Sequence, residues 1–298
     1  MTEALQGLGD RLRLPLIVAP MTGVSGPELV AAACLAGVVG AFPTSNCGSS
    51  GELDEWLATI QAARRDALSR VGATAPGPIA ANLIIRGNRR IEADIEVLGR
   101  QGVALAITSV GSPAEVVAPL HAAGIQVLAD VASMRHAERA LEAGVDGLVL
   151  LTAGAGGHTG WANGFAFVRA VRAEYDGPVV LAGGVSDGEA LWAAIVLGCD
   201  MAYMGTKFIA TEESRASPAY RRALVDASLD DVELGIAPNG IAASSLRGGG
   251  GSAGHSVSGV TGIMTARAVV EQTEREWHSA RERTLRLLAP GSYAPLAE

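Results

Sequence analysis

A lone histidine among glycines is the feature of this chain best suited to acid–base chemistry. It lies in the segment Ala153-Gly-Ala-Gly-Gly-His158-Thr-Gly160. An imidazole with a pKa of about 6.5 can accept a proton near neutral pH. Single histidines are more often surface or hydrogen-bonded core residues, but the small neighbours leave this ring open to a ligand. We therefore expect His158 to act as a general base. His255, which shares a second glycine-rich loop with Ser252, is the other candidate.

Two glycine-containing segments follow apolar runs near residue 200. Gly183-Gly184 comes directly after residues 179–182, and Gly205-Thr206 comes directly after residues 201–204. Glycine lets backbone N–H groups approach an anion closely, and the Thr206 hydroxyl adds a donor. In a barrel the loops after the last two strands often form a phosphate site. The glycines could instead only permit tight turns, but the agreement of both loops favours phosphate binding.

Other catalytic constellations are missing from the sequence. It has no His-Glu-x-x-His motif, and Cys34, Cys47 and Cys199 lack paired spacing, so we expect no metal site and buried thiols in a reducing cytosol. Asp130 stands nearly alone among the expected strand ends, which argues against paired-carboxylate chemistry. With so few acids, bases and nucleophiles, a phosphate-bearing cofactor is expected to supply the reactive group.

Composition excludes several classes of protein. The 298 residues are 49% hydrophobic and 18% charged, which excludes a disordered chain. The longest apolar stretches are too short and too interrupted by glycine for a membrane span, and residues 1–13 lack the apolar region of a signal peptide. A net charge of −8 argues against a nucleic-acid partner. We expect a cytoplasmic protein that acts on a small molecule; the oligomeric state stays open, with a homodimer allowed.

Eight short apolar runs alternate with helical patterns along the chain. The runs are continuously apolar, which is typical of parallel strands buried on both faces. The expected strands are residues 16–20, 38–42, 79–83, 103–108, 125–130, 147–151, 179–182 and 201–204. The expected helices are residues 28–36, 52–69, 90–101, 114–123, 134–143, 165–172 and 188–197. Glycine follows five of these helices, where a left-handed C-cap favours it: Gly37, Gly102, Gly124, Gly144 and Gly198.

Eight strand–helix units predict a (β/α)8 TIM barrel, with a doubly wound sheet as the alternative because periodicity does not report closure. We expect residues 1–210 to form a cofactor-binding barrel and residues 211–262 a helical and glycine-rich lid over its mouth. Within the lid, residues 214–232 look helical and residues 235–262 loop-rich. Residues 263–298 are expected to contribute a helix, 266–288, that packs back on the barrel. The run of glycines from Gly248 to Gly251 fits a flexible linker and a mobile active-site loop equally well.

A set of motifs occurs in the order found in one enzyme family. They are Ala19-Pro-Met21, Ala81-Asn82-Leu83, Gly144-Val-Asp146, Ala155-Gly-Gly-His158-x-Gly160, Leu181-Ala-Gly-Gly-Val-Ser-Asp-Gly188, Gly205-Thr-Lys-Phe208 and Ser252-Ala-Gly-His255. From about residue 15 to residue 270 the chain thus resembles the nitronate monooxygenases, formerly called 2-nitropropane dioxygenases. The resemblance implies a barrel that binds FMN and oxidises alkyl nitronates, such as propionate 3-nitronate, with O2.

The resemblance also implies roles for individual residues. Met21 and Asn82 would lie near the flavin ring, and His158 would remove the α-proton of a neutral nitroalkane or orient the nitronate. The residues expected to hold the ribityl phosphate and its surroundings are Gly156, Gly184, Tyr203, Met204, Gly205 and Thr206.

Three departures from the family pattern leave the substrate open. Leu151 and Gly154 stand where the family usually has glutamine and an acidic residue, and Lys207 replaces an arginine. Flavin barrels with nearly the same motifs include NAD(P)H-dependent enoyl-thioester and quinone reductases, which are the second hypothesis. A non-redox barrel that binds another phosphorylated ligand is the third.

Overall fold

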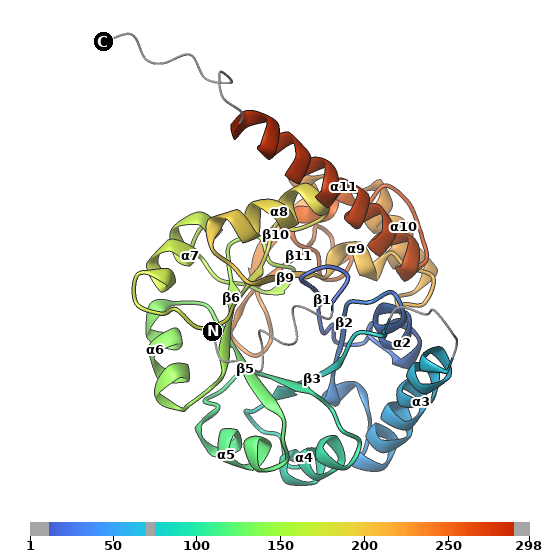
Figure 1. Cartoon of the computed structure of the whole chain (residues 1–298), viewed down its shortest axis with the longest axis vertical. Coiled ribbons are helices and arrows are strands. Elements are labelled where there is room, and N and C mark those ends of the chain that lie inside the picture. The colour runs from blue at the N-terminus through green and yellow to red at the C-terminus, as the bar shows by residue number, and fades with distance from the viewer. Residues whose placement is uncertain (1–11, 70–74, 289–298) are drawn as a thin grey trace.

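Eight parallel strands close into a barrel surrounded by helices in the computed structural model (Figure 1). The structure describes residues 12–69 and 75–288. The start of the expected segment 1–210, the end of the expected segment 263–298 and most of residues 1–13, where no signal peptide is expected, lie outside the described residues. The barrel strands are β1 (Leu16–Val18), β2 (Val39–Pro43), β3 (Ile79–Ile84), β4 (Leu105–Ser109), β5 (Gln126–Val131), β6 (Gly147–Leu151), β8 (Val179–Ala182) and β9 (Met201–Met204). Because β9 pairs with β1, the predicted TIM barrel is confirmed and the doubly wound sheet is wrong.

Seven helices follow the strands close to their predicted positions in the described part of the barrel. They are α2 (Pro27–Leu35), α3 (Ser50–Leu68), α4 (Ile91–Arg100), α5 (Ala114–Ala122), α6 (Met134–Glu142), α7 (Gly164–Arg172) and α8 (Gly188–Leu197). Several begin at a side-chain cap: Ser133 accepts a hydrogen bond from the His136 N–H, and Asn163 accepts one from the Phe165 N–H. The five glycines predicted as C-caps all have positive φ, as a left-handed helix end requires.

The barrel strands are buried on both faces, which explains their continuous apolar runs. Inward-facing residues such as Ile17, Leu128 and Val149 form one core inside the barrel. Residues that alternate with them, such as Val18 and Leu148, pack between the strands and the helices in a second core. Strand alternation therefore decides which side chain at each strand end reaches the barrel axis.

The chain after β9 departs from the predicted helix-and-loop pattern. It forms α9 (Thr206–Ile209), α10 (Pro218–Asp226), a 3-10 turn (Leu229–Asp231), β10 (Val232–Ile236), β11 (Ala242–Leu246), a second 3-10 turn (His255–Gly259) and α11 (Ala266–Leu288). The expected helix over residues 214–232 is too long at both ends: Ser217 caps the start of α10, and a capping box between Ser228 and Asp231 starts a new turn after it. Residues 235–262 are loop-rich as expected, but they also contain most of a β-hairpin.

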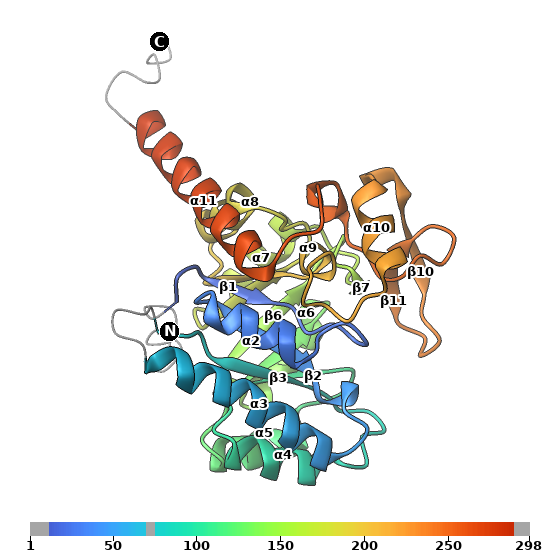
Figure 2. The same cartoon turned by 90° about the vertical axis from the view of Figure 1, so that its right-hand side faces the viewer.

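The hairpin completes a small sheet at the mouth of the barrel. The two-residue strand β7 (Gly157–His158) pairs antiparallel with β11, so the sheet order is β10-β11-β7. Figure 2 shows this sheet and α10 together beside one end of the barrel. The Asn239-Gly240 dipeptide between two apolar runs is a strong hairpin signal that the sequence interpretation missed.

Helix α11 packs against α8 and α2. A Cβ at Gly188, the first residue of α8, would overlap the Thr273 carbonyl oxygen and the Trp277 amide nitrogen, so only glycine fits there. The rings of Trp192 and Trp277 meet edge to face at a centroid distance of 5.2 Å in the same interface. None of the helices in residues 12–69 and 75–288 is long and apolar enough to cross a membrane.

We expect Gly188→Ala to lower the free energy of unfolding by about 3 kcal/mol, because the methyl group forces α8 and α11 apart. Urea unfolding followed by circular dichroism measures the loss. Gly235→Ala is the matched control: a Cβ there meets no atom within 4 Å, so its stability should stay near that of the wild type. Equal stabilities of the two variants would contradict this account of the α8–α11 contact.

Candidate active site

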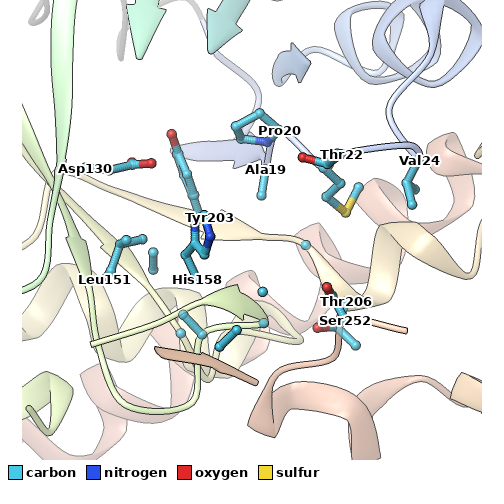
Figure 3. Close-up of a pocket in the computed structure, with 18 of the residues that line it drawn as sticks. Ala19, Pro20, Thr22, Val24, Asp130, Leu151, His158, Tyr203, Thr206 and Ser252 are labelled. Carbon is cyan, nitrogen blue, oxygen red and sulfur yellow. The ribbon is translucent and has the colours of Figure 1, made fainter. Parts of the chain in front are cut away.

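A cavity of about 550 Å³ lies at the carboxyl ends of the barrel strands (Figure 3). Its volume falls in the range of small-molecule sites. The barrel provides its floor, and the chain after β9 provides part of its wall through Tyr220 of α10, Ala243 of β11 and Ser252. The C-terminal extension therefore covers the mouth of the barrel.

The floor of the cavity is polar on one set of strands and apolar on the others. Each of the residues Asn82, Ser109 and Asp130 comes two positions after an interior residue of its strand, so alternation turns it toward the barrel axis. Tyr203 on β9 belongs to the interior core itself. The apolar part of the floor consists of Ala19, Pro43, Leu151 and Ala182.

The polar floor residues differ in whether the protein satisfies them. The Asn82 amide donates to the Ile107 carbonyl oxygen at 3.0 Å and contacts the Ser109 hydroxyl at 3.1 Å. In contrast, Asp130 Oδ1 and the Tyr203 hydroxyl are buried and hydrogen-bond to no atom in the described ranges. Figure 3 shows these two side chains converging on the same part of the cavity.

Burial controls the charge of this pair. It raises the pKa of the Asp130 carboxyl to about 7. Burial also raises the pKa of the Tyr203 hydroxyl well above its usual range, and the nearby Asp130 charge adds to that shift. Tyr203 is therefore a neutral donor at neutral pH, while Asp130 exists in both forms. The sequence interpretation did not place Asp130 among the site residues. The signal that could have identified it is an acidic residue at an inward-facing position of an otherwise apolar strand.

His158 reaches the cavity from the short strand β7. The ring is half-buried, and its Nε2 lies 2.9 Å from Nδ2 of Asn239 in the hairpin turn. Oδ1 of Asn239 accepts the Ile241 N–H at 3.1 Å, which turns the amide NH2 group toward the ring. Nε2 is then the acceptor and Nδ1 carries the proton. Burial lowers the pKa of His158, so the imidazole is neutral at neutral pH, as a general base must be.

The glycine loops meet at the other end of the cavity. Gly183 has a φ of +125°, and a Cβ there would overlap the Thr152 hydroxyl oxygen at 2.5 Å, so only glycine fits at this position. Gly184 also has positive φ, and a Cβ there meets nothing within 4 Å. The Thr206 hydroxyl accepts the Gly254 N–H at 3.0 Å, so its own hydrogen can be donated to a ligand. Backbone and one hydroxyl thus surround an open space.

The first turn of α8 does not contribute to this open space. The Asp187 carboxylate accepts the Ala190 N–H at 2.8 Å, and the Glu276 carboxylate accepts the Gly188 N–H at 3.0 Å. Both acceptors carry negative charge, so the protein itself occupies the position that an anion would take at this helix start. The loops, rather than the start of α8, are the candidate anion site.

The structure brings together most of the residues singled out from the sequence. The residues that line the cavity are Met21, Asn82, Gly156, His158, Gly183, Gly184, Tyr203, Gly205, Thr206 and Ser252. Met204 and His255 do not line it: the Met204 side chain is buried among the helices, and the exposed His255 lies against Gly154. Among the described residues no group of three or more His, Cys, Asp or Glu could hold a metal ion.

The glycine-rich loop also takes a definite place. Gly251 lines the cavity, close to the ring of Tyr220, whose hydroxyl donates to the Ser252 carbonyl oxygen. The end of the loop therefore lies at the cavity, whereas Gly248, Gly249 and Gly250 do not line it, and the choice between a linker and a mobile active-site loop stays a prediction.

Comparisons with known proteins agree on one family and one fold. A family model described as nitronate monooxygenase matches residues 9–249. A nitronate monooxygenase from Paraburkholderia phytofirmans is 32% identical over 248 residues, in a match that covers 71% of this chain and 67% of that protein. A (3aS,4S,5R,7aS)-5-hydroxy-7a-methyl-1-oxo-octahydro-1H-indene-4-carboxyl-CoA dehydrogenase from Mycobacterium tuberculosis is 29% identical over 237 residues, 78% of this chain and 63% of that protein. The matches thus span about two thirds of the relatives' lengths.

Solved structures share the barrel and its extension. FabK from Thermotoga maritima superposes with a TM-score of 0.82 at 23% identity, covering 94% of this chain and 97% of FabK. A nitroalkane oxidase from Streptomyces ansochromogenes superposes with a TM-score of 0.80 at 24% identity, covering 95% of this chain and all of the other (100%). At these identities the two structures establish the common fold only.

Proposed function

The chain belongs to the nitronate monooxygenase family of flavin-dependent oxidoreductases, and we propose that it binds FMN and uses O2 to oxidise an alkyl nitronate or nitroalkane, such as propionate 3-nitronate. One observation carries this proposal: a single cavity joins a glycine-lined anion site to a half-buried, neutral His158. Its partners in the proposal are a small-molecule substrate and O2, in the cytoplasm.

The glycine loops of the cavity support binding of the phosphate of FMN. The open space beside Gly184 would take the phosphate, with the Thr206 hydroxyl as a donor. Met21, which follows β1, and Asn82 on β3 line the same cavity, where the ring would be held. When bound, FMN supplies the electron acceptor that no side chain of this site provides.

The protein's own residues would position the substrate and move one proton. His158 would take the α-proton of a neutral nitroalkane on Nε2, the nitrogen whose lone pair now faces Asn239. The substrate would therefore displace the Asn239 amide, which until then keeps the imidazole in the required tautomer. A preformed nitronate has no such proton to lose, so His158 would only orient it.

A reductase is the second candidate. The curated relative named as a carboxyl-CoA dehydrogenase favours it, because a thioester substrate fits the same family. In that case NAD(P)H would reduce the flavin, and an enoyl thioester or a quinone would accept the electrons. The apolar Leu151 in the cavity floor is compatible with either substrate class.

Spectroscopy and two assays distinguish these candidates. The purified protein is expected to be yellow and to release FMN on denaturation. It should consume O2 with propionate 3-nitronate when no NAD(P)H is added. Rapid NAD(P)H oxidation with a quinone or an enoyl thioester, and none with the nitronate, would establish the reductase instead. A colourless protein that takes up no FMN would reject both.

A further inference from the structure

Two buried polar atoms in the cavity floor lack partners within the protein. Asp130 Oδ1 and the Tyr203 hydroxyl hydrogen-bond to no atom of residues 12–69 and 75–288, although Tyr203 is only 7% exposed. A buried polar group without a partner lowers stability, so such groups usually bind something. Both atoms border the cavity, and Figure 3 shows them at its inner end. A ligand in the cavity is the partner that they can reach.

The two side chains come from separate parts of the barrel and meet at its axis. Asp130 lies on β5, and Tyr203 lies on β9; β6 and β8 stand between them in the sheet. Both side chains point into the same part of the cavity, so one ligand group there lies between them (Figure 3). The neighbours in the floor, Ser109 on β4 and Leu151 on β6, carry no charge.

We propose that Asp130 and Tyr203 form an oxyanion subsite, in which two O–H groups donate to one ligand oxygen that carries negative charge. The identity of that ligand rests on the proposed function. For a neutral nitroalkane the C–H bond breaks and its proton goes to Nε2 of His158. The electron pair of that bond forms the C=N bond, and the charge moves to the nitro oxygens, where the two donors stabilise it.

The chemistry of the pair suits this role only in one protonation state. A neutral carboxylic acid beside a tyrosine can bind an oxyanion, as in ketosteroid isomerase. An ionised Asp130 would repel the same oxygen. Because burial raises the pKa of Asp130 to about 7, the subsite is expected to weaken as the pH rises through neutrality. The other titratable side chains that line the cavity are His158 on β7, Tyr203 on β9 and Tyr220 on α10.

The ligand oxygen that accepts from Asp130 and Tyr203 could also be a carbonyl oxygen of the flavin ring. The test therefore measures two ligands on the holoprotein: propanoate, an unreactive carboxylate with the shape of a nitro group, and FMN itself. Propanoate affinity is measured by the change in flavin absorbance at about pH 6 and about pH 8.5. We expect the wild type to bind propanoate about tenfold or more weakly at the higher pH.

Three variants identify the groups responsible. Tyr203→Phe should weaken propanoate binding about tenfold at the lower pH, because one donor is lost. Asp130→Asn keeps an N–H donor and cannot ionise, so it should retain binding at the lower pH and remove most of the pH dependence. Tyr175→Phe is the control: its hydroxyl donates to the Asp146 carbonyl oxygen outside the cavity, so propanoate affinity should not change. Circular dichroism checks that each variant folds.

The outcomes separate the subsite from the proposed function. Unchanged propanoate affinity with weaker FMN binding in Tyr203→Phe would support the subsite and place the flavin oxygen in it. Unchanged affinity of Tyr203→Phe for both ligands, or a pH dependence that persists in Asp130→Asn, would overturn the proposal. If the protein binds propanoate as expected but does not oxidise a nitronate, the proposed function fails and the subsite stands. If the protein binds no FMN, isothermal titration calorimetry measures the propanoate affinity of the same variants in place of flavin absorbance.

Discussion

Replacing His158 by alanine is expected to lower kcat/KM for a neutral nitroalkane by about 10²- to 10⁴-fold while the protein still binds FMN. The physical reason is that burial lowers the pKa of His158 and the Asn239 amide faces Nε2, so the imidazole is held neutral beside the substrate space. Oxidation of the preformed nitronate should fall much less, because no carbon acid has to be deprotonated. Oxygen uptake with nitroethane and with its nitronate measures the two effects.

His255→Ala provides the matched control for that experiment. The His255 ring is exposed and does not line the cavity, so both rates should stay near those of the wild type. Equal losses on the two substrates in His158→Ala would assign His158 an orienting role only. Full activity of His158→Ala on the neutral nitroalkane would remove it from the reaction.

Replacing Asp130 by asparagine is expected to stabilise the protein at high pH, although the change lies in the cavity. Burial raises the pKa of Asp130 from 3.8 to about 7, so the folded state binds this proton more tightly than the unfolded state. Between about pH 4 and pH 7 the free energy of unfolding therefore falls as the pH rises, and above pH 7 the loss is complete. The full difference corresponds to at most about 4 kcal/mol, and solvent in the cavity reduces it to about 2 kcal/mol.

Urea unfolding at about pH 4.5 and about pH 8 measures this effect. Asp130→Asn should match the wild type at the lower pH and exceed it at the higher one. The control is Asp54→Asn: hydrogen bonding by the Gln101 amide lowers the pKa of the Asp54 carboxyl, so removing that charge should give no gain at high pH. A difference between Asp130→Asn and the wild type that does not vary with pH would contradict the raised pKa. A stability gain of Asp130→Asn at the higher pH would indicate that Asp130 serves function rather than folding.

The barrel could be predicted from local patterns alone. Strands such as β6 and β9 are buried on both faces, so their sequences are continuously apolar and are recognisable without knowledge of their neighbours. Helix ends are marked by residues that satisfy the nearby backbone, as Gly144 does after α6. Eight such units favour a barrel, and the pairing of β9 with β1 in the structure decides its closure.

The candidate site could be predicted only in part, because local patterns identify loops at the strand ends but not the direction of each side chain. Gly183, Gly184 and Thr206 were recognisable because loops at the strand ends of a barrel meet at one face whatever the helices do. Met204 was placed in the same group by its position in a motif, but strand alternation turns its side chain outward into the core. A motif reports which residues are neighbours in the chain and not which face each one occupies.

The contacts that give the site its chemistry depend on pairings between distant parts of the chain. His158 and Asn239 lie 81 positions apart and meet because β7 joins the hairpin of β10 and β11. Asp130 and Tyr203 meet because closing the barrel turns both toward its axis. Local patterns specify which elements form and where they end, since backbone hydrogen bonding and burial act over a few residues. Which side chains share one cavity, and hence their pKa values and partners, follows from the folded arrangement of the whole chain.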